Sequence, residues 1–411
     1  MRLLPARVVE TIAPARLGRS FRFLLAASAI NNAGDGVVIA AGPLLVASLT
    51  RDPFLVSLAL FMERLPTLLF GVLGGVAADR FDRRRMVVIA NLIRAAILAG
   101  LVVTIATGAV TIWLVLVALF AMGTAEVMAD SASSTLLPSL VARADLGTAN
   151  ARMSGAMLLT NQLLLPPLGA FLFALDRSLP FAANGVSFIA AVILISRVVT
   201  PVRERAERTT VRADLVEGVR WLLAHPPMRT LTLTILAFNI TFGAPWAVLV
   251  LYATERLGMS EIGFGLITTA IAIGGLIGTA SYGWLERRFT LGDIMRVGLL
   301  IETVTHLVLA LTTSAAVALG MLVIFGAHGF VWGTTSTVVR QRSVPDEVLG
   351  RVGGVYRVAI QGGIVIGTPI GGLIAGLFGI TAPFWFGFVG SAILVTILWR
   401  QFALIAHDAE I

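Results

Sequence analysis

Long apolar segments separated by short arginine-rich breaks are the feature that most restricts how this chain of 411 residues can fold. Hydrophobic residues make up 57% of the sequence and charged residues only 13%, whereas a soluble domain carries about 25% charged residues. Each segment approaches or exceeds the roughly 20 apolar residues that a helix needs to cross a bilayer. The twelve segments run near 22–49, 53–78, 86–107, 110–134, 148–175, 178–199, 229–253, 261–285, 293–312, 315–338, 352–378 and 381–402. The sequence therefore predicts an all-α membrane protein with twelve transmembrane helices.

The distribution of arginine predicts the orientation of these helices. All 31 cationic residues are arginine, which hints at a GC-rich bacterial genome, and 26 of them fall in the tails and alternate loops that would share one side of the membrane. The opposite loops hold only Arg51, Arg177 and Arg256, while Arg64 and Arg94 lie inside spans. By the positive-inside rule, we expect both termini in the cytoplasm and the protein in a bacterial inner membrane. The net charge of +8 comes from arginines that flank spans, so it gives no reason to expect nucleic acid as a partner.

Residues of the first half recur in the second half 207 positions later, which predicts an internal duplication. The pairs are Asn32 and Asn239, Gly36 and Gly243, Gly71 and Gly278, Asp79 and Glu286, Arg80 and Arg287, Pro138 and Pro345 and, at a spacing of 202, Pro167-Leu-Gly169 and Pro369-Ile-Gly371. Because six spans separate the copies, both enter the membrane in the same orientation, so we expect two six-helix bundles related by a parallel pseudo-twofold axis along the membrane normal. The expected bundles are residues 1–199 and 229–411, joined by a cytoplasmic linker with a surface helix at 200–228.

The loop between the second and third spans contains a distinctive charged motif. Its residues are Gly75, Asp79, Arg80, Arg83 and Arg84. The spacing resembles the signature of the major facilitator superfamily, Gly-x-x-x-Asp-Arg/Lys-x-Gly-Arg-Arg/Lys, with Asp82 in place of the second glycine. The resemblance implies the twelve-helix fold of that superfamily, transport by alternating access, and a cytoplasmic gate at this loop. In some members a carboxylate of the fourth span pairs with the arginine that matches Arg83, which here assigns Asp130 to the gate.

Other motifs resemble one branch of this superfamily, which holds macrolide-efflux and enterobactin-export proteins. They are Asn32-Ala-Gly-Asp35-Gly, Arg64-Leu-Pro66, Leu137-Pro138-Ser-Leu-Val, Glu217-Gly-Val-Arg-Trp-Leu-Leu-Ala-His-Pro-Pro and Val344-Pro-Asp-Glu-Val-Leu-Gly-Arg351-Val. The branch implies a secondary active exporter of an amphipathic small molecule of the drug, macrolide or siderophore type, driven by a proton gradient. We expect a monomer in the lipid bilayer. An importer or a lipid-moving facilitator on the same fold is the alternative.

Polar and aromatic residues near the middle of spans one, four, seven and ten form the expected substrate cavity, because these spans line the cavity in the superfamily. The residues are Asn31, Asn32, Asp35, Glu126, Asn239, Phe242, Trp246, His328 and Trp332. An ionisable residue inside a span is a functional hypothesis by default. The aromatic residues could instead contact lipid or the core, and His328 could equally be a hydrogen-bonded packing residue.

Two carboxylates of this set, Asp35 and Glu126, are the expected sites of proton coupling. Burial in a span favours a carboxylate that exchanges protons. The alternative for Asp35 is a structural ion pair with Arg64 or Arg94. The Arg-x-x-Gln-Gly motif that proton-antiporter relatives often carry in the fourth span is absent.

Two other sets of residues in the second half are assigned structural roles. Gly363, Gly367 and Gly371 repeat every four residues on the eleventh span, which is typical of a close-packing face, expected against the second or eighth span. Glu302 and His306 lie one turn apart on the ninth span, which is peripheral in the superfamily fold, so we expect them to be structural.

The sequence lacks the motifs of an intramembrane enzyme. It contains no cysteine, no His-Glu-x-x-His and no Gly-x-Ser-x-Gly, and only four histidines. Without lysine a Walker-type phosphate loop cannot form, so ATP is not expected to drive transport directly. No metal or other cofactor is expected.

Overall fold

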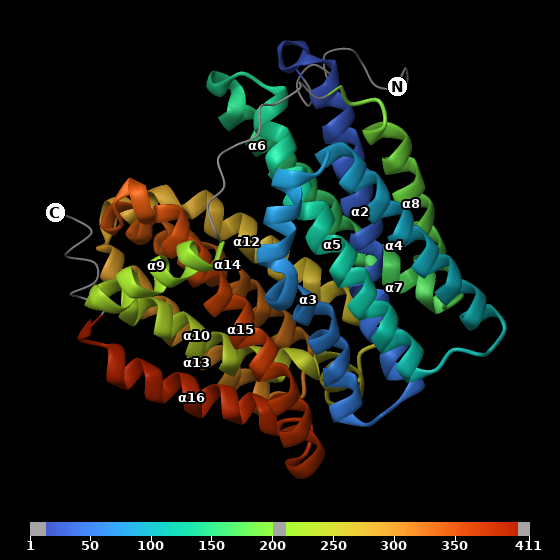
Figure 1. The fold of residues 1–411 in the computed structure, drawn as a ribbon. Coiled ribbons are helices and arrows are strands. Elements are labelled where there is room, and N and C mark those ends of the chain that lie inside the picture. The colour runs from blue at the N-terminus through green and yellow to red at the C-terminus, as the bar shows by residue number, and fades with distance from the viewer. Residues whose placement is uncertain (1–13, 200–210, 402–411) are drawn as a thin grey trace. The chain divides into compact units, whose positions relative to one another are not determined.

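The computed structural model describes residues 14–199 and 211–401, and helices are the only regular secondary structure in these ranges (Figure 1). The helices before the linker are α2 (Gly18–Leu49), α3 (Pro53–Arg80), α4 (Arg83–Ala106), α5 (Ile112–Leu140), α6 (Leu146–Met157), α7 (Leu165–Leu175) and α8 (Leu179–Ile195). A π-helical segment, η3 (Leu158–Leu164), makes α6 and α7 continuous. The linker helix is α9 (Val211–Ala224). The helices after it are α10 (Pro226–Ala247), α11 (Leu249–Leu251), α12 (Glu261–Arg288), α13 (Leu291–Leu311), α14 (Ala315–Ser343), α15 (Asp346–Phe378) and α16 (Ala382–Leu398), with the π-helical turn η4 (Tyr252–Arg256) after α11.

Within the described ranges, ten helical segments are long and apolar enough to cross a membrane. Two further apolar helices, Leu179–Ile195 and Ala382–Leu398, have 17 residues each and complete the twelve expected spans. A 17-residue helix is about 26 Å long, close to the hydrocarbon thickness of a bilayer. The prediction of an all-α membrane fold is confirmed.

The ends of the helices follow local sequence signals. Asp82 caps α4 by accepting a hydrogen bond from the amide of Arg85 at 2.7 Å, and its backbone is extended, with φ of −65°. The turn therefore does not need the left-handed geometry that favours glycine, which is why an aspartate can replace it. The helix α14 continues to Ser343, beyond the predicted end at 338, and stops where Val344 precedes Pro345, because a residue before proline avoids the helical region.

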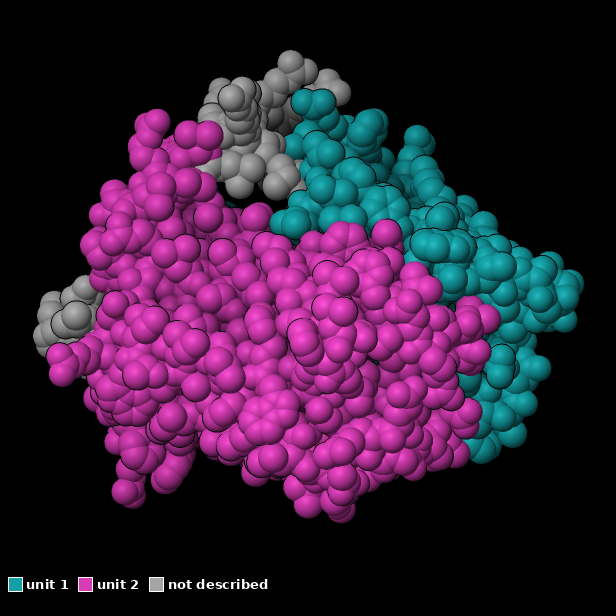
Figure 2. Space-filling view, turned by 90° about the horizontal axis from the view of Figure 1, so that it is seen from below, with its two compact units in different colours: residues 1–46, 65–207 teal, residues 47–64, 208–411 magenta. Residues whose placement is uncertain are grey.

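The described chain forms two compact units (Figure 2). The first unit comprises Met1–Val46 and Leu65–Glu207, and within it α4 packs against α5 and α8. The second comprises Ala47–Arg64 and Arg208–Ile411, and within it α10 packs against α15, α12 against α14, and α13 against both α14 and α16. Residues 47–64 group with the second unit, because Ser57 of α3 contacts Gly372 of α15.

The sequence repeat appears as the same helix crossing in each unit. In the first unit Gly169 of α7 lies against the carbonyl group of Val37 in α2, and in the second Gly371 of α15 lies against the carbonyl group of Ala244 in α10. A Cβ atom at either glycine would overlap the facing backbone. Val37 and Ala244 are 207 positions apart, and Gly169 and Gly371 are 202 positions apart. The two residues of this contact therefore repeat in the second unit, each at one of the two spacings found in the sequence.

The glycine face of α15 packs on α10, the seventh span. Gly363 approaches Asn239, Gly367 approaches Ile240, and the contact continues to Gly371. The prediction that this face meets the second or eighth span is therefore wrong. Small residues at this spacing allow close approach but carry no information about which neighbouring helix approaches.

The linker helix α9 lies on the second unit, whereas the predicted linker residues 200–210 fall outside the described part of the chain. Its Gly218 fits against the carbonyl group of Arg351 in α15, and Leu222 is buried in the core shared by α10, α13 and α15. Glu217 also pairs with Arg351 at 2.9 Å. The rest of the helix surface exposes the apolar Val216 and Leu223 together with the charged Glu217 and Arg220.

Candidate functional site

The first unit contains an ion-pair cluster centred on Arg94 of α4. Its Nη2 atom lies 3.0 Å from Oδ1 of Asp35 on α2 and 3.7 Å from Oε2 of Glu126 on α5. Asn184 of α8 donates a second hydrogen bond to the same Asp35 oxygen at 3.3 Å. From the sequence, either Arg64 or Arg94 could pair with Asp35. In the structure Asp35 pairs with Arg94, and Arg64 pairs with Glu63.

Arg94 is almost completely buried, whereas its two carboxylate partners are not. The exposed fractions of the side chains are 4% for Arg94, 26% for Asp35 and 49% for Glu126. The guanidinium also stacks over the ring of Phe188 at 4.1 Å, and its Nε has no hydrogen-bond partner among the described residues. A buried arginine needs a carboxylate to offset its desolvation, so the pairing is structural.

Asp130, one helical turn beyond Glu126, belongs to the electrostatic environment of this cluster. Its charge interacts with those of Glu126 and Arg94. Three carboxylates thus surround one arginine, and when all are ionised the group carries an excess of negative charge.

Asparagines extend the polar region along α2. Asn31 donates to Asn91 of α4 at 3.4 Å, and Asn91 is fully buried. Asn32 donates to the carbonyl group of Ser28 at 2.8 Å, one turn earlier on its own helix. Asn161, in the π-helical segment η3, donates to the carbonyl group of Asn32 at 3.5 Å. These bonds satisfy part of the amide groups, whereas Oδ1 of Asn31 and Nδ2 of Asn91 are buried without a hydrogen-bond partner among the described residues.

The signature loop is held to α5 by Arg83. Its side chain donates to the carbonyl groups of Ala78 at 3.2 Å and Thr135 at 3.1 Å. The charge of Asp130 interacts with those of Glu126 and Arg94. The pairing of Asp130 with Arg83 that the superfamily resemblance implies stays a prediction.

The other signature residues surround this loop. Gly75, Arg80 and Arg84 lie at the end of α3 and the start of α4, and Asp79 lies in the last turn of α3, although its side chain is outside the described part of the structure. A Cβ atom at Gly75 would meet nothing within 4 Å, whereas Gly74 lies against the backbone of α5. Gly74 is thus the closely packed residue at this end of α3.

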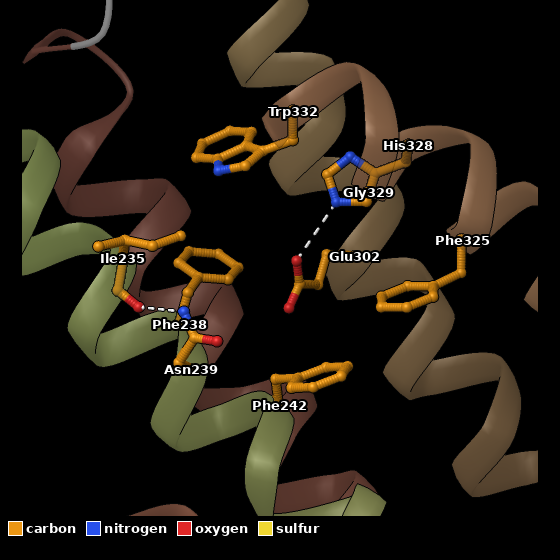
Figure 3. A pocket seen from close by; sticks show the side chains of 9 residues that line it. All are labelled: Ile235, Phe238, Asn239, Phe242, Glu302, Phe325, His328, Gly329 and Trp332. Atoms are coloured by element: carbon orange, nitrogen blue, oxygen red, sulfur yellow. Dashed lines mark hydrogen bonds and ion pairs between the residues drawn. The ribbon is translucent and has the colours of Figure 1, made fainter. Parts of the chain in front are cut away.

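The second unit contains a cavity of about 150 Å³ between α10, α13 and α14 (Figure 3). It is lined by Ile235, Phe238, Asn239, Phe242, Glu302, Phe325, His328, Gly329 and Trp332. Four of these residues, Asn239, Phe242, His328 and Trp332, were assigned to a cavity from the sequence, and the structure brings them together. Trp246 does not line the cavity but stacks on Phe242 at 4.4 Å between ring centres.

The polar group of this cavity is a pair that sequence reasoning missed. His328 Nε2 lies 3.3 Å from Oε2 of Glu302, and the side chains are 4% and 12% exposed. Figure 3 shows the Glu302 carboxylate between the rings of Phe242 and Trp332, directed at His328. The expectation of a purely structural Glu302 followed from placing the ninth span at the periphery. The available signal was the presence of two ionisable residues in neighbouring spans, each needing a partner.

His306 has the structural role expected of it. Its Nδ1 donates to the carbonyl group of Glu302 at 3.0 Å, and its buried ring packs against Gly387 of α16. The ring therefore fills the contact between α13 and α16 and lies outside the cavity lining.

Comparisons with known proteins agree with this architecture. Residues 9–410 match the family model described as transmembrane secretion effector. The chain is 26% identical over 376 residues to the multidrug efflux pump Tap of Mycolicibacterium fortuitum, with 88% of this chain and 90% of that protein covered. It is 24% identical over 362 residues to the enterobactin exporter EntS of Shigella boydii, with 86% and 85% covered. Its fold is similar to the crystal structure of a bacterial homologue of the iron transporter ferroportin in the inward-facing state, with a TM-score of 0.73, 20% identity, and coverage of 93% of this chain and 98% of that one.

The family match covers nearly the whole chain, and it agrees with the signature loop, the apolar helices and the repeated helix crossing. The relatives are efflux proteins of the same superfamily. This protein belongs to the transmembrane secretion effector family of the major facilitator superfamily and is a multi-pass membrane transporter.

Proposed function

We propose that this transporter is a proton-coupled exporter of an amphipathic small molecule, working by alternating access in a bacterial inner membrane with both termini in the cytoplasm. The observation that carries the proposal is the sharing of one Arg94 nitrogen between Asp35 and Glu126. The relatives named as a multidrug efflux pump and an enterobactin exporter support the outward direction and a substrate of the drug, macrolide or siderophore type.

The geometry around Arg94 supports the proposal of proton coupling. When Asp35 is ionised, it holds Arg94 at 3.0 Å, while Glu126 lies 3.7 Å from the same nitrogen. A proton bound to Asp35 removes its charge, so the buried guanidinium must be neutralised by Glu126 instead. The exchange of partners alters contacts between α2, α4 and α5. A proton that favours one arrangement of these helices over another shifts the conformational equilibrium by its differential affinity.

The cavity of the second unit supplies the surface for the cargo. Its aromatic walls suit the apolar part of a small molecule, while Asn239 and the pair of Glu302 and His328 supply polar contacts. The signature loop, with Asp79, Arg80, Arg83, Arg84, Gly75 and the nearby Asp130, is proposed as the cytoplasmic gate.

The test is transport by the purified protein in liposomes with an imposed pH gradient. We expect a labelled macrolide or enterobactin to move against its concentration gradient when protons flow the other way, and to stop when an ionophore collapses the pH gradient. Empty liposomes and liposomes with the Asp35→Asn variant are the controls. Transport that continues unchanged after the pH gradient has collapsed would refute proton coupling. Net movement of the substrate in the same direction as the protons would favour an importer.

A further inference from the structure

A second cavity, of about 240 Å³, lies in the second unit between α10, α14 and α15. Two arginines line it, Arg340 of α14 and Arg357 of α15. Trp332 and Ile235 line both this cavity and the one with Glu302, so the two cavities are neighbours. The proposed export mechanism uses neither arginine.

The side chain of Arg340 is held in a fixed orientation. Its guanidinium stacks over the ring of Tyr356 at 4.5 Å, and the Tyr356 hydroxyl is hydrogen-bonded to that of Ser336. Tyr356 and Ser336 are both buried, with 5% and 2% of their surface exposed, so the platform under the guanidinium is rigid. Stacking occupies the face of a guanidinium and leaves its N–H groups at the edge available for a ligand.

Three carboxylates on or near these helices are bonded to other cations. Glu286 pairs with Arg342 at 3.3 Å, Glu217 with Arg351 at 2.9 Å, and Glu302 with His328. Within the described part of the chain, no carboxylate lies within 4.0 Å of the Arg340 or Arg357 guanidinium. The cavity therefore carries two positive charges for which the described side chains supply no acidic partner.

We infer that this cavity binds the anionic group, a carboxylate or a phosphate, of an amphipathic molecule. The anion would bond to Arg340 and Arg357, and the apolar part would lie on Trp332 and Ile235. Arginine is well suited to such groups because its N–H donors match the two oxygens of a carboxylate or phosphate. The source is either the exported molecule, in which case the inference rests on the proposed export function, or an anionic lipid of the membrane.

The test is a calorimetric titration of the purified protein, in neutral-detergent micelles, with two isosteric probes, 2-naphthoate and 2-naphthamide. The probes share their aromatic part and differ in charge, so their difference reports the anion site. We expect the parent protein to bind naphthoate at least about tenfold more tightly than naphthamide, because hydrogen bonds to a charged group are stronger than those to a neutral amide. Equal affinity for the two probes would overturn the inference.

Three variants locate the site. Arg340→Gln and Arg357→Gln should each weaken naphthoate binding about tenfold and leave naphthamide binding unchanged. Arg342→Gln, on the same helix as Arg340 but bonded to Glu286, is the matched control and should bind both probes as the parent does. Arg357 is exposed, so its replacement tests the site even if Arg340→Gln fails to fold. Unchanged naphthoate affinity in Arg357→Gln and in any folded Arg340→Gln would contradict the assignment.

The source of the anion is decided in lipid nanodiscs. If an anionic lipid is the natural occupant, phosphatidylglycerol in a phosphatidylcholine nanodisc should raise the apparent Kd of naphthoate in the parent and not in Arg357→Gln. If the exported molecule is the occupant, the Kd should not depend on phosphatidylglycerol. The titration needs no gradient, so it is independent of transport. A protein that prefers naphthoate but transports nothing contradicts only the export proposal. A protein that transports but binds the two probes equally contradicts only the anion site.

Discussion

The two units place opposite chemistry at equivalent points of a repeated scaffold. Asp35 in α2 and Phe242 in α10 are 207 positions apart, the spacing that also relates Asn32 to Asn239. In the first unit that position holds a carboxylate bonded to a buried arginine, and in the second it holds a ring stacked on Trp246. The duplication preserved the helix crossing at Gly169 and Gly371 and allowed the side chains beside it to diverge.

The comparison suggests that the first unit serves coupling and the second serves substrate binding. The first unit contains charges that can exchange partners, so it is suited to respond to protons. The second unit contains an aromatic cavity whose acid, Glu302, is paired with His328, so it is suited to hold an apolar molecule. A substitution in the first unit should therefore alter coupling, and one in the second should alter affinity.

The largest effect is expected for Arg94→Ala, which leaves Asp35 without its cation. Breaking a buried ion pair by removing one partner costs about 3–5 kcal/mol, so the thermal unfolding midpoint should fall sharply. Adding Asp35→Asn should restore a large part of the loss, because the remaining charge is removed. The matched control is Arg342→Ala in the second unit, whose exposed pair with Glu286 should cost less than about 1 kcal/mol. Equal losses for the two arginines would contradict a special role for the cluster.

Asp35→Asn should abolish transport against a gradient while permitting equilibration down a gradient. Asparagine keeps the shape and can still accept a hydrogen bond from Arg94, but it cannot take up a proton. The measurement compares counterflow with pH-driven uptake in the same liposomes. If pH-driven uptake by the variant equals that of the parent at every pH, Asp35 is not the coupling residue and the role passes to Glu126 or is absent.

Phe242→Ala should weaken substrate binding about tenfold and leave coupling intact. The ring stacks on Trp246 and Phe325, and each aromatic pair contributes about 0.5–1.5 kcal/mol beyond the area that it buries. The readout is the substrate concentration at half-maximal uptake, measured together with the ratio of uptake with and without the pH gradient. Val317→Ala, which shortens an exposed side chain on α14, is the control. A change in the ratio with unchanged affinity would reverse the proposed division between the units.

The smallest effect concerns the turns that precede the last helix of each unit. The first unit uses Asp176, whose pKa is lowered by hydrogen bonds from the side chain and backbone of Ser178, and the second uses Gly379, with φ of +92°. A lowered pKa in the folded state stabilises the turn above the ordinary value of 3.8, and this contribution is lost as the pH falls through the folded pKa. Ser178→Ala should move the pKa of Asp176 back toward 3.8, which NMR titration of the labelled carboxyl carbon would show. An unchanged pKa would mean that the backbone bond alone is responsible.

Much of the fold could be predicted from the sequence, because membrane spans have a strong compositional signal and the signature loop has a fixed spacing. The site was less accessible. Asn239 and Phe242 were predicted to face a cavity, yet Glu302 was not, because the helix that carries it was expected at the periphery. Asn184, which binds Asp35, stands in an apolar span with no local pattern that would identify its partner. The contact partners of polar residues in a span depend on helix rotation, which the sequence alone does not specify.

The break in helix geometry at η3 gives the first unit a backbone feature that the matching helix of the second unit lacks. In the second unit α15 is an uninterrupted α-helix of 33 residues, about 50 Å long, although Pro369 removes one backbone hydrogen bond from its interior. In the first unit the corresponding helix contains the seven π-helical residues Leu158–Leu164, a wider turn with a shifted hydrogen-bond ladder. This π-helical segment contains Asn161, whose amide donates to the carbonyl group of Asn32 in α2. The two units therefore share a helix crossing but differ in the backbone hydrogen bonding of the helix that forms it.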